Sequence, residues 1–254
     1  MPSERIIRSF PNGAALERAA AEMFVQKARE AIAARGIFVV ALAGGSTPRR
    51  LYALLADEGD VFRAQLAWDR IHFFWGDERH VPPDHADSNF RMANEAMLAR
   101  VPIPPQNVHR IFAENPDAAQ AAQLYEEEIA GCLGRNDAKF PRLDLVLLGM
   151  GPDGHTASLF PGTTALKEDS RWVVSNWVEK FQTDRITMTA PMLNHGGCIV
   201  FLVQGGEKAE VLRNVLFGER NTELYPSQLI QAVEGECYWL VDQPAAERLP
   251  STGR

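Results

Sequence analysis

Short apolar runs alternate with amphipathic helical segments along this chain, and that alternation constrains its fold more than any other feature. Apolar residues recur at helical spacing over residues 12–35, and Gly36 follows as a typical helix C-cap. The run IFVVA at 37–41 then predicts a buried strand. The order returns along the chain, with further strands predicted at 71–75, 143–148, 172–177, 186–189, 199–203 and 238–241, and further helices at 49–56, 88–100, 116–132 and 207–216.

Polar and proline residues mark where some of these helices begin. Ser88 is the predicted N-cap of the segment 88–100. Asn115 and Pro116 predict the N-cap and first position of the next helix. Strands that alternate with helices favour a three-layer α/β/α fold with a mostly parallel, Rossmann-like sheet covered on both faces. No repeat or linker divides the chain, so we expect one domain over residues 1–254, with a fraying polar tail after Gln243.

The charge balance narrows the classes of partner. Thirty-three acidic residues against 26 basic ones give a net charge of −7, which suits neither nucleic acid nor an anionic membrane. A small anionic ligand stays compatible, because a pocket needs only a few local cations. The first ten residues contain no apolar segment of a signal peptide, and no run approaches 18 apolar residues, so we expect a cytoplasmic protein.

Cysteine usage agrees with a reducing compartment. Cys132, Cys198 and Cys237 are far apart and form no C-x-x-C pair, which argues against a disulfide framework or a zinc knuckle. Cys198 and Cys237 lie in apolar runs and are predicted to be buried thiols.

Three strand-end segments concentrate the chemistry. The carboxyl ends of parallel strands converge on one edge of the sheet, where ligands bind. In the first segment, Gly44 and Gly45 let the backbone approach a ligand, and Ser46 and Thr47 add hydroxyls before a helix whose free amides favour an anion. This segment is neither a Walker A loop nor a G-x-G-x-x-G fingerprint. It is equally compatible with a plain strand-to-helix turn.

The second and third segments supply charged and titratable groups. Asp77 and Arg79 follow the strand at 71–75, where they either face a pocket or belong to a solvated loop. An arginine there can hold a phosphate or stabilise an oxyanion. His155 follows the glycine-rich bend at 149–154 and is the best candidate base, with Asp153 placed to orient its ring.

Two isolated cations, Arg185 and Lys208, can complete a phosphate site with the Ser46-Thr47 turn. Other chemistries have no motif here: the chain lacks the G-x-S-x-G elbow of serine esterases and the H-E-x-x-H spacing of zinc enzymes. His80 and His85, near two aspartates, allow at most incidental metal binding, so no metal is expected.

The segments 42–48, 74–82 with 88–89, 145–161 and 185–189 together resemble those of the bacterial-type 6-phosphogluconolactonases, relatives of glucosamine-6-phosphate deaminase. They occur in the family's order and span roughly residues 10–241. The resemblance implies a fold like the deaminase and ribose-5-phosphate isomerase group. It also implies hydrolysis of 6-phospho-D-glucono-1,5-lactone in the oxidative pentose phosphate pathway, without a cofactor.

The resemblance also implies roles for individual residues. His155 matches the base that activates water, Asp77 and Arg79 match the active-site loop, and Gly45, Ser46, Thr47, Arg185 and Lys208 match the sugar-phosphate site. One segment departs from the family, which often has Lys-Pro-Pro before the Arg-Ile-Thr run. This chain reads KFQTD at 180–184, so the contact of Lys180 with the phosphate is open.

Two alternatives stay beside the lactonase interpretation. A glucosamine-6-phosphate deaminase resembles this chain, but carries a ring-opening glutamate where Phe160 stands here. A non-catalytic sugar-phosphate sensor would carry an N-terminal DNA-binding module, and residues 1–36 predict only one helix. The sequence favours a monomer, because no apolar helix face is left unassigned.

Overall fold

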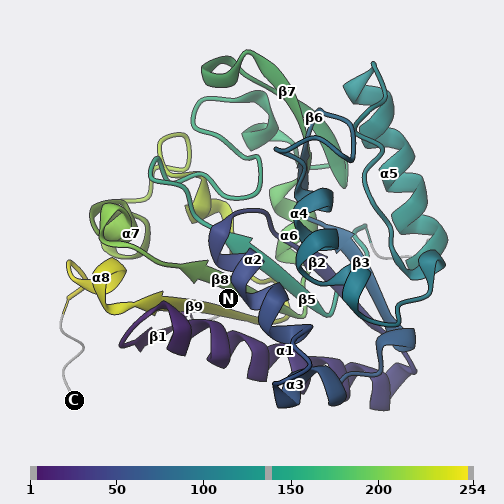
Figure 1. Ribbon diagram of the computed structural model, residues 1–254. Helices are drawn as coiled ribbons and strands as arrows, with labels where there is room; N and C mark the ends of the chain where they lie inside the picture. The colour runs from purple at the N-terminus through teal and green to yellow at the C-terminus, as the bar shows by residue number, and fades with distance from the viewer. Residues whose placement is uncertain (1–4, 135–138, 251–254) are drawn as a thin grey trace.

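The computed structural model describes residues 5–134 and 139–250 and contains the predicted alternation of strands and helices. Its main sheet has six parallel strands in the order β1-β9-β8-β5-β2-β3 (Figure 1). The fold is therefore α/β, as predicted. The strands are β1 (Arg5–Phe10), β2 (Phe38–Leu42), β3 (Ile71–Trp75), β5 (Leu145–Gly149), β8 (Cys198–Val203) and β9 (Glu236–Asp242).

Helices cover both faces of this sheet. Every residue of β2 and β8 is buried, as expected for interior strands of a parallel sheet. Neighbouring residues of β3 point to opposite faces. Phe74 lies 6.2 Å from Tyr125 of α5 (Ala118–Leu133), whereas Trp75 lies 5.5 Å from Phe90 of α4 (Asn89–Ala96), both measured between ring centroids. The two helices therefore lie on opposite faces, which gives the predicted three layers.

Caps define the longest helix, α1 (Gly13–Arg35). The Asn12 side chain accepts a hydrogen bond from the Ala15 amide, and Gly36 adopts a left-handed φ of 82° at the other end. Leu16 and Phe24 on its inner face are fully buried. Burial of each such side chain contributes about 1.5–3 kcal/mol to the free energy of unfolding.

Three predicted helix starts were wrong. The helix predicted from residue 207 is α7 (Ala209–Phe217), which begins only after a 3₁₀ turn. Helix α2 begins at Ser46, three residues before the predicted start, so Ser46 and Thr47 form its first turn. Helix α5 begins at Ala118, because the Asp117 side chain caps it by accepting hydrogen bonds from two amides. Asn115 instead caps the turn before it, through the Asp117 amide. The other α-helices are α3 (Val61–Ala64), α4 (Asn89–Ala96), α6 (Ala190–Asn194), α7 (Ala209–Phe217) and α8 (Gln243–Ala246), and α2 and α5 end at Leu55 and Leu133.

Short 3₁₀ turns link several of these elements. They are η1 (Trp68–Arg70), η2 (Leu98–Arg100), η3 (Pro105–Asn107), η4 (Thr164–Lys167), η5 (Glu179–Phe181), η6 (Gly206–Lys208) and η7 (Pro226–Leu229).

A second, antiparallel sheet was not predicted. It consists of β4 (Asp77–Arg79), β7 (Thr183–Met188) and β6 (Val173–Val178), in that order. The segment 77–79, expected to be a loop, is thus an edge strand paired with β7, with Arg79 opposite Arg185. In Figure 1 the β6–β7 hairpin stands clear of the main sheet, at the top of the view.

The two ends of the described chain also differ from expectation. Strand β1 pairs in parallel with β9, although the sequence pattern did not reveal it. Residues 243–246, predicted to fray, form helix α8, because Asp242 caps it and Ala245 is fully buried. The rest of the predicted tail includes residues 251–254, which lie outside the described residues.

The cysteines are free, and Cys198 and Cys237 are buried as predicted. One hydrophobic cluster joins residues of both sheets and their helices. A single domain stays our prediction. No helix in the part of the chain that the structure describes is long and apolar enough to cross a membrane.

Candidate active site

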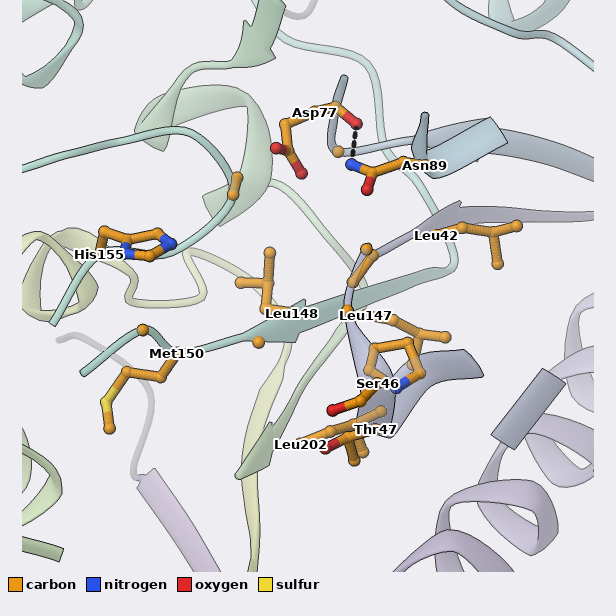
Figure 2. A pocket seen from close by; sticks show the side chains of 18 of the residues that line it. Leu42, Ser46, Thr47, Asp77, Asn89, Leu147, Leu148, Met150, His155 and Leu202 are labelled. Carbon is orange, nitrogen blue, oxygen red and sulfur yellow. Dashed lines mark hydrogen bonds between the residues drawn. The ribbon is translucent and has the colours of Figure 1, made fainter. Parts of the chain in front are cut away.

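The carboxyl ends of β2, β3 and β5 open onto one cavity. Its walls come from the segments after these strands, together with Leu202 and Lys208 near the end of β8. Figure 2 shows His155 on one side, Ser46 and Thr47 on another, and Asp77 with Asn89 on a third. The three strand-end segments therefore converge, as the topology of a parallel sheet requires.

The wall formed by α2 presents a helix N-terminus to the cavity. Gly45 is the N-cap of α2 and makes no side-chain cap hydrogen bond. Its φ of 102° lies in the region that favours glycine. The amides of the first helical turn lack partners within the helix and carry its positive dipole end, which suits an anion. The Ser46 and Thr47 hydroxyls lie in the same turn.

The opposite wall carries a histidine held by a carboxylate. His155 Nδ1 and Asp153 Oδ1 form a short hydrogen bond, which leaves Nε2 as the nitrogen available for proton transfer. The ring stacks on Phe160, with 4.1 Å between centroids, and Figure 2 shows it directed into the cavity. Burial raises the pKa of the Asp153 carboxyl, but the hydrogen bond and charge of His155 outweigh burial and bring that pKa well below its usual range. Asp153 is therefore an ionised partner that orients the imidazole.

A network of buried polar groups holds the third wall. The Asp77 carboxylate accepts a 2.6 Å hydrogen bond from the Ser158 hydroxyl. The side-chain amide of Asn89 donates a 2.9 Å hydrogen bond to the Asp77 backbone carbonyl. Beneath them the Glu78 carboxylate accepts backbone hydrogen bonds from the amides of residues 79, 89 and 90. Burial raises the pKa of Glu78 although these amides oppose the shift. The network fixes β4 to the start of α4.

Three cations lie at or beside the cavity. Lys208 and Arg79 line it, and Arg185 is paired with Arg79 across β4 and β7. Burial lowers the pKa of Lys208, and burial followed by the Arg79 charge lowers that of Arg185. The three side chains take part in none of the ion pairs found among residues 5–134 and 139–250. Carboxylates act on Lys208 and Arg185 only from beyond ion-pair distance in this part of the chain, so these charges suit an anionic ligand.

A comparison with known proteins identifies the family. Residues 11–239 match the model of the family described as glucosamine-6-phosphate isomerases/6-phosphogluconolactonase. The chain belongs to this family. It is 44% identical over 220 residues to a 6-phosphogluconolactonase of Synechocystis, and the matched region covers 87% of this chain and 88% of the relative. It is 39% identical over 246 residues to one from Nostoc, covering 97% of this chain and 99% of the relative. The structure of 6-phosphogluconolactonase from Trypanosoma cruzi has a TM-score of 0.84 at 32% identity and covers 98% of each chain.

Most residues that the sequence assigned to a site of this family meet at the cavity. Asp153 lies next to His155, and Arg185 beside Arg79, but neither lines the cavity itself. The roles of all these residues stay predictions. Those that line the cavity are Gly44, Gly45, Ser46, Thr47, Asp77, Arg79, His155 and Lys208.

Lys180 lies elsewhere, in the segment that departs from the family pattern. Its side chain is 63% exposed, and its ammonium lies 3.6 Å from Asp153 Oδ2. It lines a separate pocket with Phe160 and Trp177 instead of the cavity. The structure therefore places Lys180 behind the His155–Asp153 pair, away from the helix N-terminus of α2.

The sequence analysis missed two cavity residues. Asn89 had no assigned role, although it is the first residue of α4 and is only 2% exposed. Ala157 adopts a φ of 47°, a strained conformation for a residue with a side chain, and it lines the cavity beside His155. The signals for Asn89 were its place directly after the capping Ser88 and its inclusion in the segment 88–89 that resembles the family.

The histidines considered for incidental metal binding have other partners. His80 Nε2 lies 2.6 Å from the Asn115 carbonyl oxygen, and His85 Nδ1 lies 3.2 Å from the Asp87 amide. They form no group of three ligand atoms within the described residues.

Asp153 gives a prediction about pH and stability. Its folded-state pKa lies below the unfolded value of about 4, so the ionised carboxylate stabilises the fold above that pH and loses this effect as pH falls through the folded value. We expect Asp153→Asn to lower the free energy of unfolding at pH 7, by about 1 kcal/mol for this partly exposed pair. Urea unfolding between about pH 7 and pH 2 should show the difference from the wild type shrinking below about pH 4. A difference independent of pH would contradict the assignment.

Gly44 gives a second prediction. A Cβ at this position would collide with the Asn89 carboxamide. We expect Gly44→Ala to lower the free energy of unfolding by about 1–3 kcal/mol, because Asn89 must leave its place. Gly149→Ala is the matched control, since Gly149 lines the same cavity and its Cβ would meet nothing within 4 Å. Adding Asn89→Ala to Gly44→Ala should recover much of the loss in urea unfolding, and purely additive effects would refute the collision.

Proposed function

We propose that this protein hydrolyses 6-phospho-D-glucono-1,5-lactone to 6-phospho-D-gluconate, in the oxidative pentose phosphate pathway. The observation that carries the proposal is the His155 imidazole, oriented by Asp153 and directed into a cavity whose other walls hold a helix N-terminus and cations. The proposal is also supported by the relatives named 6-phosphogluconolactonase in Synechocystis, Nostoc and Trypanosoma cruzi.

The proposed reaction is the addition of water across the lactone bond. His155 Nε2 takes a proton from a water molecule while the water oxygen attacks the C1 carbonyl carbon. Arg79 or a backbone amide stabilises the resulting oxyanion. The tetrahedral intermediate then collapses, the bond between C1 and the ring oxygen breaks, and His155 returns its proton to that oxygen. The product is an open-chain carboxylic acid with a free hydroxyl.

Asp153 supports this cycle without exchanging protons itself. Its ionised carboxylate fixes the proton on Nδ1, so Nε2 carries the lone pair that removes the proton from water. The same carboxylate stabilises the imidazolium that forms during the attack. The buried network through Asp77 keeps Arg79 in place on the facing wall.

The phosphate group of the substrate is proposed to lie at the N-terminus of α2. Ser46 and Thr47 supply amides and hydroxyls, and Lys208 supplies a partly buried charge on the same cavity. Arg185 adds a second charge beside Arg79, on the smaller sheet. Anchoring the phosphate holds C1 near His155 and converts binding energy into orientation. These steps use only water and side chains of this chain, so we propose that the reaction needs no cofactor.

Phe160 argues for the lactonase over the deaminase alternative. It is buried and stacks on His155, where the related deaminases carry a ring-opening glutamate. A phenyl ring transfers no proton, so amine release by that route has no acid here. A sensor without activity would not require the His155–Asp153 pair.

The test is a coupled assay with lactone prepared fresh from glucose 6-phosphate by glucose-6-phosphate dehydrogenase. We expect the protein to accelerate loss of the lactone well beyond its spontaneous hydrolysis. No acceleration together with binding of 6-phosphogluconate would contradict the enzyme and favour a sensor. Release of ammonia from glucosamine 6-phosphate would instead favour the deaminase.

We further propose a cytoplasmic monomer that acts on a small phosphosugar and binds neither nucleic acid nor membranes. The net charge of −7 supports the last two points. Sedimentation analysis at working concentration measures the oligomeric state directly.

A further inference from the structure

Two histidines and a cysteine form a cluster on the α5 face of the main sheet, outside the catalytic cavity. His72 belongs to β3, His109 lies in the connection between η3 and α5, and Cys132 lies in the last turn of α5. One ligand atom from each side chain lies within 4.8 Å of the other two, the one such group among the described residues. None of the three lines the cavity of His155. Residues from three separate segments thus converge on one point.

We propose that His72, His109 and Cys132 bind a zinc ion, through His72 Nδ1, His109 Nε2 and the Cys132 thiolate. Imidazole nitrogen and thiolate sulfur are the ligands that zinc prefers in proteins. Three protein ligands leave the fourth tetrahedral position to water.

The distances suit a tetrahedral ion. His72 Nδ1 lies 3.0 Å from His109 Nε2 and 3.5 Å from Cys132 Sγ. Ordinary zinc–ligand bond lengths and tetrahedral angles separate two nitrogens by about 3.4 Å and a nitrogen from a sulfur by about 3.6 Å. The nitrogens therefore need to move apart by only a few tenths of an ångström. Sγ also lies within 4.8 Å of His109 Nε2.

His109 is held in the orientation that a ligand requires. Its Nδ1 lies 2.6 Å from Glu128 Oε1, and its ring stacks on Phe74 with 4.3 Å between centroids. A proton on Nδ1, donated to Glu128, leaves the Nε2 lone pair facing His72. A carboxylate behind a histidine ligand is the usual outer partner in zinc sites, where it fixes the tautomer and raises the basicity of the ring.

Two ring nitrogens that face each other need a proton or a metal ion between them, because two lone pairs repel. Without metal, a proton on His72 Nδ1 fills that place by donating to His109 Nε2. Burial, and then the nearby His109, lower the pKa of His72, so its imidazole stays in the neutral form that binds metal. Burial and Glu128 raise the pKa of the Cys132 thiol, so the ion must displace its proton on binding. Zinc takes the place of both: the His72 Nδ1 proton moves to Nε2 as the ring changes tautomer, and the Cys132 thiol proton is released to solvent.

The bound ion would join α5 to the edge strand of the main sheet. β3 is the last strand in the sheet order, and the Tyr125 hydroxyl of α5 already bonds to the Trp75 backbone at its other end. Zinc at His72 would fix the opposite end of the strand to the same helix. Binding to the folded chain alone raises its stability with rising zinc concentration.

The test uses cobalt(II) as the spectroscopic substitute for zinc. Metal-free full-length protein titrated with cobalt should show a thiolate-to-cobalt charge-transfer band and tetrahedral d–d bands that saturate at one ion per chain. Zinc should displace the cobalt and raise the melting temperature. Cys132→Ser should abolish the charge-transfer band, and Glu128→Gln should weaken the affinity roughly 10–100-fold.

Matched variants exclude other thiols and histidines. Cys198→Ala removes another thiol, His85→Gln an exposed histidine beside Asp87, and His155→Ala the proposed catalytic base; all three should keep the cobalt spectrum. No charge-transfer band in folded wild type, or a band that survives Cys132→Ser, would overturn the proposal. If Cys132→Ser does not fold, Glu128→Gln decides, because its side chain is 46% exposed and wild-type affinity in that variant contradicts the site.

Discussion

Replacing His155 with alanine is expected to lower kcat for lactone hydrolysis about 10²–10⁴-fold, the range typical of a lost general base. KM should change little, because the proposed phosphate site lies on the opposite wall of the cavity (Figure 2). The measurement is the initial rate on freshly generated lactone, corrected for spontaneous hydrolysis. The fold should survive, since the His155 side chain is 25% exposed and the chain around it is held by its own hydrogen bonds.

His195→Asn is the matched control for that experiment. His195 is also half-buried, but its Nδ1 contacts the Pro191 carbonyl oxygen and its ring lies against Phe140, outside the cavity. It should retain wild-type kcat. A near-normal kcat in His155→Ala would remove this residue from the base role, and the mechanism would need another proton acceptor.

Replacing Lys208 with alanine is expected to raise KM about 10–100-fold, with a smaller change in kcat. A charge-assisted hydrogen bond to an anion contributes about 1.5–3 kcal/mol, which corresponds to that range of affinity. The proposed contact holds the phosphate equally in the ground state and the transition state, so its loss affects binding more than the chemical step. Steady-state kinetics and the inhibition constant of inorganic phosphate measure the effect.

Lys167→Ala provides the comparison. Its side chain is 79% exposed, pairs with Glu223 at 3.8 Å and lies outside the cavity. It should leave KM unchanged. An unchanged KM in both Lys208→Ala and Arg185→Ala would move the phosphate away from this wall.

Five of the six strands of the main sheet, all but β1, and the position of the candidate site followed from the sequence because they depend on local patterns. A short apolar run between predicted helices, such as 199–203, predicts a buried strand. Parallel strands bring their carboxyl ends to one edge of the sheet, whatever the order of the strands. Cap residues fixed the end of α1 through Gly36. They misplaced α5, because both Asn115 and Asp117 can cap and only the packed structure selects between them.

The second sheet escaped prediction because one of its three strands carries the wrong signal, although strands were predicted at 172–177 and 186–189. β4 is three charged residues, Asp77 to Arg79, which resemble a solvated loop. They form a strand only because β7, more than 100 residues later, supplies the partner backbone. The position of Lys180 likewise could not be read from the sequence, since it depends on the β6–β7 connection and not on its neighbours in sequence.

The contacts between side chains that shape the cavity could not be predicted from the sequence. No sequence pattern shows that the space beside Gly44 belongs to the Asn89 carboxamide, because Gly44 follows β2 whereas Asn89 begins α4, 45 residues later. Likewise, His72 and Cys132 look unrelated until β3 and α5 pack together. Sequence reasoning identifies candidate groups, whereas distances between segments decide which of them act together.

The pairing of β1 with β9 sets the order of events during synthesis. β1 lies at one end of the sheet and pairs with β9, with Phe10 opposite Asp242. A ribosome adding about 5–20 residues per second needs on the order of 10–50 s to span that interval. Throughout this time β1 has no partner strand, because β9, with which it pairs, has not yet been synthesised. The sheet is therefore completed only after β9 has been synthesised, and the nascent β1 segment has to avoid other chains until that partner leaves the ribosome.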